Sequence, residues 1–423
     1  MLQKLLSGMY PFSDEMKHLS SESLFKRAAK VIPGGSYGHT SPVSSLPLHF
    51  PKFAEKASGC KYIDVDGNEW IDFMCGYGAI IHGYREPSIE SAVDEIRTRG
   101  TIFNHPHSVM VELAEMLTSE IDFGNWAVFA KNGSDLTTWS IRVAREFSQK
   151  PYIIKACGSY HGVDAWCDPG MGGRISSDRS EILEFKWNDL NQFEDLFKKF
   201  SNQIAGVILC PYHHPAFLPS VMPNDEFWGS VRKICDEHEA VLILDDVRAG
   251  WRMHSQGSHR YFDFAPDLGV YSKALGNGYA ISACVGSERL KKAASDVFLT
   301  GSSWNDASAM VAAVQSLSLS KSKNVAESIL KKGRFFCEGI EKLAQQSGFD
   351  LEMTGPQSMP YPWFKGDDNL YLIQKFCEYA SIEGLFFHPH HNWFISDAHD
   401  MDTLADSLEK TETAFKSLSD SLS

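Results

Sequence analysis

The stretch AVLILDD, residues 240–246, decides the fold. Five apolar residues followed by two carboxylates predict a strand that is buried on both faces and carries polar groups at its carboxyl end. Similar apolar runs occur as YIIKA (152–156) and AGVILC (205–210), and helical patterns such as FWGSVRKICDEHE (227–239) lie between the runs. Apolar strands that alternate with helices predict an α/β fold with a mostly parallel sheet covered by helices.

The length of 423 residues indicates two domains, because single hydrophobic cores stop growing at roughly 250–300 residues. We expect a large domain over 76–305 and a smaller α+β domain built from both ends of the chain, 1–75 and 306–423. CKYIDVDGNEWIDFM (60–74) predicts a hairpin of two short strands across an Asp-Gly turn. The final residues FKSLSDSLS (415–423) indicate a fraying tail.

The composition favours a small-molecule partner. A net charge of −14 argues against a nucleic acid held by general electrostatics, since that mode of binding needs clustered Lys and Arg. No apolar window is long enough to span a membrane, and the first residues, MLQKLLSGMYPFSDEMK, carry charges where a secretory signal is apolar. We therefore expect a cytoplasmic protein without a membrane partner. Nine scattered cysteines without a C-x-x-C pair indicate neither a disulfide framework nor a zinc site.

Two of the segments that follow predicted strands suggest a ligand site. After AVFA (127–130), Gly133 and Ser134 open a helix, whose free N–H groups favour a phosphate or carboxylate. Ser134 or the next residue could equally be an ordinary helix cap. After YIIKA, the ring of Tyr160 could stack on a flat heteroaromatic ligand, whereas His161 is equally consistent with a core histidine.

Asp245 and Asp246 end the predicted strand AVLILDD (240–246). A carboxylate at the end of a buried strand requires a partner, and a protonated pyridine nitrogen is one such partner. Helix capping, or a salt bridge to Arg248 or Arg252, is the alternative. Because side chains alternate along a strand, we expect Asp245 rather than Asp246 to pair with such a nitrogen.

Lys273 lies in DLGVYSKALGNGYAISACVG (267–286), between an apolar run and a glycine-rich turn. Without further information, a surface position is the usual interpretation of a lysine, because lysine is rarely buried. Together with an anion-binding helix start, a stacking ring and a strand-terminal Asp, it predicts a site for pyridoxal 5'-phosphate. That cofactor needs a phosphate site, a stacking face, an acid at its ring nitrogen and a lysine amine for a Schiff base.

With these residues, the sequence resembles a class III aminotransferase of fold type I, most closely the glutamate-1-semialdehyde aminomutase branch. Eight segments carry the resemblance in the family's order: VIPGG…SPV (31–43), YIDVDGNEWIDF (62–73), GYGAIIHGYREP (76–87), NGSDLTTWSIRVAR (132–145), SYHG (159–162), LILDDVRAGWR (242–252), PDLGVYSKALGNG (266–278) and TGSSWNDASAM (300–310).

The resemblance implies the following catalytic roles. Lys273 would hold the cofactor as a Schiff base and then shuttle a proton between the substrate carbon and the cofactor. Asp245 would keep the pyridine nitrogen protonated. Val247 would pack against one face of the ring and Tyr160 against the other.

The resemblance also implies a homodimer with shared active sites. Gly133 and Ser134 would bind the phosphate, helped by Ser302, which stands where the family usually has threonine. The loop that carries Ser302 comes from the second subunit in this family.

Departures from the family pattern fall on the substrate side. Cys210 replaces the glutamate of the usual Glu-Pro pair, Tyr77 stands where many members have tryptophan, and the arginine that follows SPV in the aminomutase branch is absent. The loop HPHHNWFIS (388–396) lacks that branch's glutamate, and its histidines do not have the spacing of a metal site. We therefore expect an aminotransferase rather than an aminomutase, and no metal.

The same departures suggest the class of substrate. Tyr77, His391 and Asn392 are expected to select the substrate, and their hydrogen-bonding groups suit a hydroxylated molecule such as the aldehyde of a sugar acid. An 8-amino-3,8-dideoxyoctulosonate-forming transaminase is one such relative, and L-glutamate is the expected amino donor. Three alternatives remain open at this point: the loop only packs the small domain, the protein is an aminomutase, or it is a non-catalytic relative.

Overall fold

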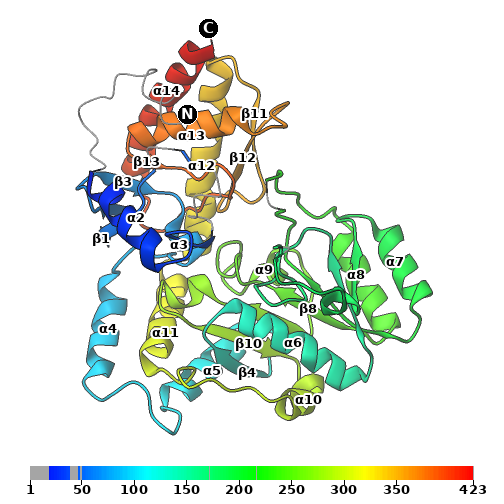
Figure 1. Ribbon diagram of the computed structural model, residues 1–423. Coiled ribbons are helices and arrows are strands. Elements are labelled where there is room, and N and C mark those ends of the chain that lie inside the picture. The colour runs from blue at the N-terminus through cyan, green and yellow to red at the C-terminus, as the bar shows by residue number, and fades with distance from the viewer. Residues whose placement is uncertain (1–18, 39–45, 48–49, 171, 216, 423) are drawn as a thin grey trace.

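The computed structural model describes residues 19–38, 46–47, 50–170, 172–215 and 217–422. The predictions that concern the first seventeen residues and residues 39–43 of the VIPGG…SPV segment lie outside these ranges. In Figure 1, a sheet with its helices forms the lower part of the molecule, and a smaller unit with the helices α12, α13 and α14 lies above it.

A seven-stranded sheet in the order β4-β10-β9-β8-β7-β5-β6 forms the centre of the lower part. The strands from β6 to β9 are parallel, whereas β10 runs antiparallel to both β9 and β4. The predicted mostly parallel sheet is therefore confirmed. Its strands are β4 (Trp126–Ala130), β5 (Tyr152–Ala156), β6 (Ile182–Phe185), β7 (Ile204–Leu209), β8 (Val241–Asp245), β9 (Leu268–Tyr271) and β10 (Ser282–Gly286).

The central strand β8 shows why the sheet is apolar on both faces. Val241 and Ile243 pack in one core cluster with α6, whereas Leu242 and Leu244 pack in another with α7 and α8. Successive side chains of a strand point to opposite faces, so Asp245 continues the α6 side. The helices around the sheet are α5 (Val109–Glu120), α6 (Gly133–Ser148), α7 (Leu190–Lys199), α8 (Phe227–Glu237), α9 (Ser258–Tyr261) and α10 (Lys291–Asp296), with short 3₁₀ turns η3 (Ser176–Arg179), η4 (Lys273–Gly276) and η5 (Glu288–Leu290).

Strands from both ends of the chain form the sheet of the smaller unit, in the order β1-β2-β3-β13. The predicted hairpin is present as β2 and β3, and β13 pairs with β3 in parallel. The elements outside the large sheet are α2 (Leu19–Val31), β1 (Ala54–Ser58), β2 (Lys61–Asp64), β3 (Glu69–Asp72), α3 (Cys75–Gly78), α4 (Pro87–Arg97), α11 (Ala307–Ser322), α12 (Val325–Gln346), β11 (Leu351–Thr354), β12 (Tyr361–Phe364), α13 (Tyr371–Ile382), β13 (Leu385–Phe386) and α14 (Met401–Leu422).

We propose the domain limits 1–75, 76–305 and 306–423 on the basis of this strand pairing. All seven strands of the large sheet fall inside the middle range, and the β3·β13 pair joins the outer two ranges.

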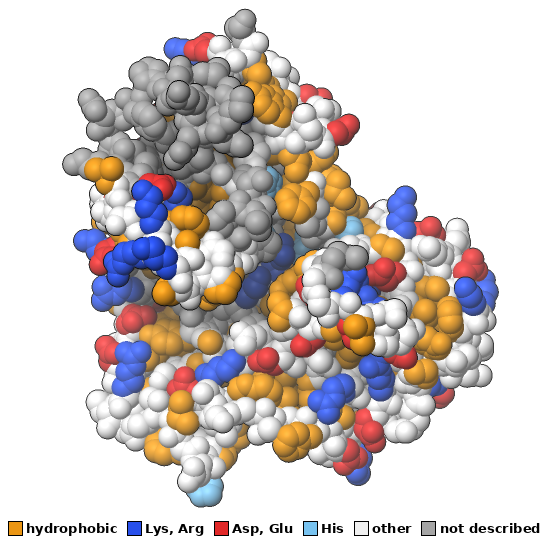
Figure 2. Space-filling view, viewed as in Figure 1, with side chains coloured by type: hydrophobic (Ala, Val, Ile, Leu, Met, Phe, Trp, Pro, Cys, Tyr) orange, Lys and Arg blue, Asp and Glu red, His pale blue; other side chains and the backbone are white. Residues whose placement is uncertain are grey.

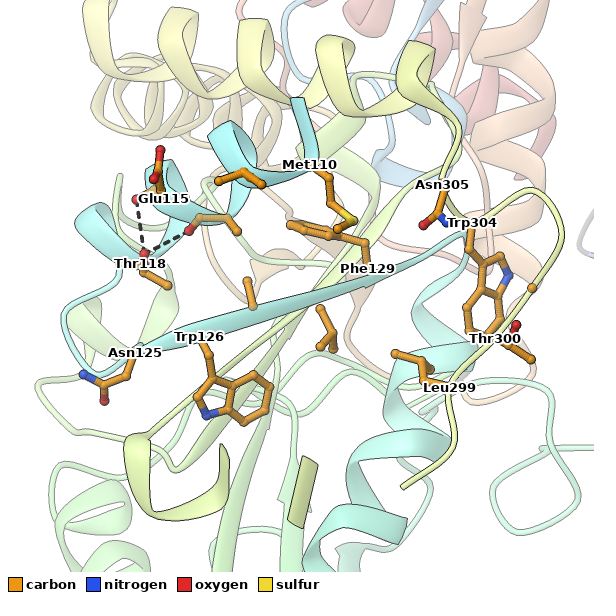
Figure 3. Close-up of a pocket in the computed structure, with 15 residues that line it drawn as sticks. Met110, Glu115, Thr118, Asn125, Trp126, Phe129, Leu299, Thr300, Trp304 and Asn305 are labelled. Atoms are coloured by element: carbon orange, nitrogen blue, oxygen red, sulfur yellow. Dashed lines mark hydrogen bonds between the residues drawn. The ribbon is translucent and has the colours of Figure 1, made fainter. Parts of the chain in front are cut away.

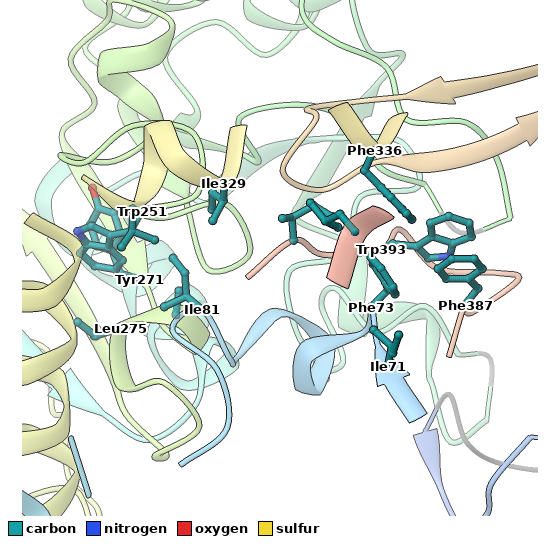
Figure 4. Packing of buried hydrophobic residues seen from close by; sticks show 14 of the residues in the cluster. Ile71, Phe73, Ile81, Trp251, Tyr271, Leu275, Ile329, Phe336, Phe387 and Trp393 are labelled. Carbon is teal, nitrogen blue, oxygen red and sulfur yellow. The ribbon is translucent and has the colours of Figure 1, made fainter. Parts of the chain in front are cut away.

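Aromatic side chains connect the smaller unit to the sheet. Phe73 stacks on Phe336 with ring centroids 4.7 Å apart, and Phe387 stacks on Trp393 at 4.0 Å (Figure 4). The same buried cluster continues to Tyr271 at the end of β9. Each aromatic pair adds about 0.5–1.5 kcal/mol beyond the area that it buries, so this core fixes the small domain above the carboxyl ends of the strands.

The prediction of a fraying tail is wrong. Helix α14 continues to Leu422, and Ala414, Phe415 and Leu418 are fully buried. These residues recur at helical spacing, but the serines between them make the segment look like a polar tail. Among the described residues, no helix combines the length and the apolar character needed to cross a membrane.

Candidate active site

A cavity of about 580 Å³ lies where the strands of the large sheet end. It is in the position where open α/β sheets bind ligands. Figure 2 shows basic side chains and histidines in the hollow between the upper and lower parts of the molecule. Most of the residues predicted for the site line this cavity: Tyr77, Gly133, Ser134, Tyr160, Asp245, Val247, Lys273, His391 and Asn392.

Lys273 lies two residues after the end of β9 and is half-buried in the cavity wall. Its φ of 50° is in the left-handed region, a strained conformation that costs of order 1–3 kcal/mol for a non-glycine residue and is typical of functional positions. Burial, aided by the positive charge of Arg248, lowers the pKa of Lys273 to about 7. A substantial fraction of the amine is therefore neutral, and so nucleophilic, near neutral pH.

Asp245 faces the cavity, where Nδ1 of His161 lies 2.7 Å from its Oδ2 atom. The His161 ring stacks on Trp166 with centroids 6.1 Å apart, and the Thr137 hydroxyl donates to the His161 carbonyl. His161 is therefore held by groups on both sides and fixes the orientation of the carboxylate. Sequence reasoning left the role of His161 undecided.

Asp246 points away from the cavity. Its carboxylate accepts hydrogen bonds from the backbone N–H of Ser258 at 2.8 Å and from the Ser258 hydroxyl at 2.5 Å. Burial raises the pKa of Asp246 to about 7. The two adjacent carboxylates thus lie on opposite sides of the strand, as expected from its alternation.

The start of α6 forms a narrow cradle. The Asp135 carboxylate caps the backbone N–H of Asn132 at 2.8 Å, and the first helical residues, Gly133 and Ser134, line the cavity. A Cβ atom at Gly133 would lie 2.6 Å from Val247 Cγ2, and one at Gly162 would lie 2.3 Å from Ser134 Oγ. Only glycine allows these close approaches.

These residues fit pyridoxal phosphate by the chemistry of their donor and acceptor groups. The helix start and the Ser134 hydroxyl suit a phosphate, the Asp245 carboxylate suits a protonated ring nitrogen, and the Lys273 amine suits an aldehyde. The Nε2 atom of His161 is buried and has no hydrogen-bond partner among the described residues. Tyr160 lies at the cavity mouth with 42% of its surface exposed.

The substrate side of the cavity contains two residues that sequence reasoning missed, Arg248 and His214. The Arg248 guanidinium donates through Nη1 to the Asn392 side-chain oxygen, and the Asn392 amide nitrogen donates to the Trp393 carbonyl at 2.9 Å. Both ends of the Asn392 amide are thus engaged by the protein. Arg248 was considered from the sequence only as a salt-bridge partner for the two aspartates.

His391 packs edge-on against Tyr77 with ring centroids 5.6 Å apart. Its Nδ1 lies 2.7 Å from the Asn392 carbonyl. Burial and the nearby charge of Arg248 lower the pKa of His391 well below its ordinary value, so the ring is neutral. Cys210, at the place of the family's glutamate, has its Sγ 3.9 Å from His161 Nδ1, and burial raises its thiol pKa.

Ser302 does not reach the cavity of its own chain. It is exposed in the segment 299–305, next to a second cavity of about 550 Å³ on the outside of the sheet. In Figure 3, Met110 of α5 points toward Phe129 of the edge strand β4, and Trp304 and Thr300 of the 299–305 segment lie beside that strand.

Comparisons with known proteins agree with this geometry. The family model described as "Aminotransferase class-III" matches residues 43–409. An aminopentol aminotransferase of Sphingopyxis macrogoltabida is 37% identical, with 94% of each chain covered. A 3-aminobutyryl-CoA aminotransferase of Cloacimonas acidaminovorans is 34% identical, with 94% of this chain and 97% of the relative covered. Glutamate-1-semialdehyde 2,1-aminomutases match at lower identity, for example 28% for one from a Sulfurihydrogenibium species.

Among solved structures, the PLP internal aldimine form of the FumI protein of Sphingopyxis sp. MTA144 superimposes with a TM-score of 0.92 at 37% identity. The match covers 94% of this chain and 95% of that one.

Proposed function

The chain belongs to the class III aminotransferases, enzymes of fold type I that use pyridoxal phosphate, and from this premise we propose that it transfers an amino group from an amino acid, with L-glutamate as donor, to a hydroxylated aldehyde or ketone. One observation carries the proposal. A lysine with a pKa near 7, a carboxylate fixed by a histidine, and a helix start open to an anion share one cavity.

The cofactor supplies an electrophilic aldehyde and a ring that takes up the electrons released at the substrate carbon. The start of α6 and Ser134 bind its phosphate. Asp245, oriented by His161, keeps a proton on the ring nitrogen. Lys273 would hold the cofactor, and its Nζ atom would also accept and return the proton of the substrate carbon, for which a pKa near the working pH is suitable.

Val247 and Tyr160 pack against the two faces of the ring in this proposal. The Val247 side chain lies directly against the start of α6, and Tyr160 lies at the mouth of the cavity. The partly exposed Tyr160 can adjust as substrate enters.

Support for a hydroxylated acceptor comes from the polar lining of the substrate side. Tyr77, His391 and Asn392 line the cavity, and a buried site that hydrogen-bonds a hydroxyl rejects analogues that lack it. The name of the aminopentol aminotransferase denotes an amine with several hydroxyl groups, which is an amino donor, and removal of its amino group leaves a hydroxylated carbonyl compound of the proposed acceptor class. A keto-sugar acid belongs to the same chemical class.

An intramolecular aminomutase is the second candidate. Relatives with that name are less similar to this chain than the two named aminotransferases, which supports the transferase. Conversion of glutamate-1-semialdehyde to 5-aminolevulinate by the purified protein would establish the aminomutase reaction instead.

We further propose a homodimer whose second chain brings Ser302 to the phosphate. The segment 299–305 lies on the outer edge of the sheet, beside the cavity of Figure 3. Ile102, Val111 and Phe298 are large apolar residues that are more than half exposed. A second copy of the chain would cover these residues. It would also supply hydroxyl and N–H donors to the phosphate site, for which the described residues of one chain provide few donors.

The test is spectroscopic. The holoenzyme is mixed with L-glutamate and other amino donors, and the cofactor absorption is followed from its lysine-linked to its aminated state. A panel of aldehydes and ketones, with and without hydroxyl groups, is then added to measure the return reaction. Failure of every amino donor to change the absorption would contradict the proposed function, and a preference for acceptors without hydroxyl groups would contradict the acceptor class.

A further inference from the structure

Arg248 is a cation in the cavity wall without an acidic partner. In the part of the chain that the structure describes, no carboxylate lies within ion-pair distance of its guanidinium, whose side-chain neighbours are the neutral amide of Asn392 and the hydroxyl of Tyr212. Arg252, four residues further on, is different. Its guanidinium donates to the carbonyls of Ile395, Gly78 and Ile80 at 2.9–3.0 Å and is fully buried.

The charge of Arg248 dominates the substrate side electrostatically. After burial, it is the next largest cause that lowers the pKa values of Lys273, His214 and His391. The two histidines are consequently neutral, so Arg248 provides the positive charge on this side of the cavity. A half-buried charge without a counter-ion is energetically unfavourable. An anionic ligand bound next to Arg248 would neutralise this charge.

The side chain of Asn392 sets the orientation of the Arg248 guanidinium. Its amide nitrogen donates to the Trp393 carbonyl, which directs its oxygen toward Arg248. The amide therefore orients the guanidinium but leaves its charge uncompensated. Beside it, the Nδ1 atom of His214 is buried and lacks a hydrogen-bond partner among the described residues.

We propose that Arg248 binds the carboxylate of the amino-acid donor and of the oxo acid that the donor becomes, and that Asn392 is a positioning residue for its guanidinium. A planar guanidinium matches a carboxylate with two parallel N–H···O bonds, which a lysine cannot do. The inference rests on the proposed aminotransferase function. It assigns the recognition of the carboxylate-bearing substrate to Arg248, in the loop that follows strand β8.

The first experiment compares Arg248→Met with Arg334→Met in the holoenzyme. Arg334 is exposed on α12, so its variant removes the same charge away from the cavity. Arg248→Met should raise the half-saturating concentration of the best carboxylate-bearing donor roughly 10- to 100-fold, as expected for the loss of a charge-assisted pair, and Arg334→Met should not. Glutarate, an unreactive dicarboxylate, should compete with that donor in the wild type and lose this effect in Arg248→Met.

The second experiment separates positioning from structural support. Asn392→Asp gives Arg248 a carboxylate of the same shape, which should compete with the substrate and raise the half-saturating concentration as much as Arg248→Met. Asn392→Ala leaves the guanidinium unpaired and should cost only a few-fold. Glutaramide, the uncharged analogue of glutarate, should bind equally weakly to both variants and the wild type.

The outcomes distinguish this inference from the proposed function. If carboxylate donors are turned over but Arg248→Met and the wild type have equal half-saturating concentrations, the inference is wrong and the aminotransferase function stands. If the enzyme accepts only amines without a carboxylate, the inference is also wrong. Equal effects of Asn392→Asp and Asn392→Ala would reject the positioning role. If no amino donor reacts at all, the proposed function itself fails.

Discussion

Nδ1 of His161 lies 2.7 Å from Oδ2 of Asp245, so a residue that follows β5 holds the carboxylate that ends β8. The pair is buried, and the same histidine is fixed from behind by Trp166. The orientation of the catalytic acid is therefore built into the sheet before a ligand arrives.

Replacing His161 with leucine should lower kcat about 10- to 100-fold, because Asp245 then loses the partner that orients it. The cofactor should also dissociate more readily, as measured by the absorption remaining after gel filtration. His213→Leu is the matched control, since His213 stacks on Trp187 and does not line the cavity. Equal losses in the two variants would indicate a general packing effect.

Asp245→Asn should reduce turnover at least about 100-fold, because the ring nitrogen loses a charge-assisted partner in a desolvated site. Asp246→Asn should cost much less turnover, since Asp246 contacts Ser258 on the opposite side of the strand. Steady-state kinetics on both variants tests this ranking, and the reverse order would contradict the proposed roles.

Lys273→Ala should abolish turnover and retain part of the cofactor affinity through the phosphate and ring contacts. In the wild-type apoenzyme, the capture of pyridoxal phosphate needs the neutral amine, whose fraction increases as pH rises through the pKa. With a pKa of about 7 instead of the ordinary 10.5, the capture rate should level off above about pH 8.

Stopped-flow absorption measures this rate, with a free lysine derivative as the reference amine. A rate that still increases tenfold per pH unit between pH 8 and 10 would argue against the lowered pKa. Borohydride reduction followed by peptide mass analysis should find the label on Lys273, and a label on Lys131 or another lysine would refute its role.

Mixed dimers test the proposed contribution of Ser302. A chain with Lys273→Ala and a chain with Ser302→Trp are co-expressed with different tags, and the heterodimer is purified. If Ser302 reaches the cofactor of the other chain, one site in the heterodimer is intact, and about half of the wild-type activity should return. Each homodimeric variant should be nearly inactive.

Sedimentation should show that Ser302→Trp remains dimeric. An inactive heterodimer would mean that each chain uses its own Ser302. A wild-type monomer with full activity would reject the shared site altogether.

The sequence predicted the large sheet well because its signal is local. Strands such as β7 and β8 are continuous apolar runs, and the side of the strand on which Asp245 lies follows from alternation alone. Helix α14 was missed because its buried residues are separated by serines, which mask the helical period.

The substrate side could not be predicted in the same way. Arg248 stands next to two aspartates in the sequence, where a salt bridge is the obvious interpretation. Its partner, Asn392, is far away in the chain and reaches it only because the small domain packs over the sheet. Contacts of this kind depend on tertiary packing, which no local pattern reports.

The parallel pairing of β3 with β13 has a consequence for how the protein is made. Ile71 has Leu385 as its register partner, which leaves the ribosome about 300 residues later, or roughly 15–60 s at about 5–20 residues per second. Until then, Trp70, Ile71 and Phe73, all buried in the finished molecule, have no strand to cover them on that side. The nascent chain therefore exposes an aggregation-prone edge for most of its synthesis, which makes it a natural client for chaperones that bind growing polypeptides.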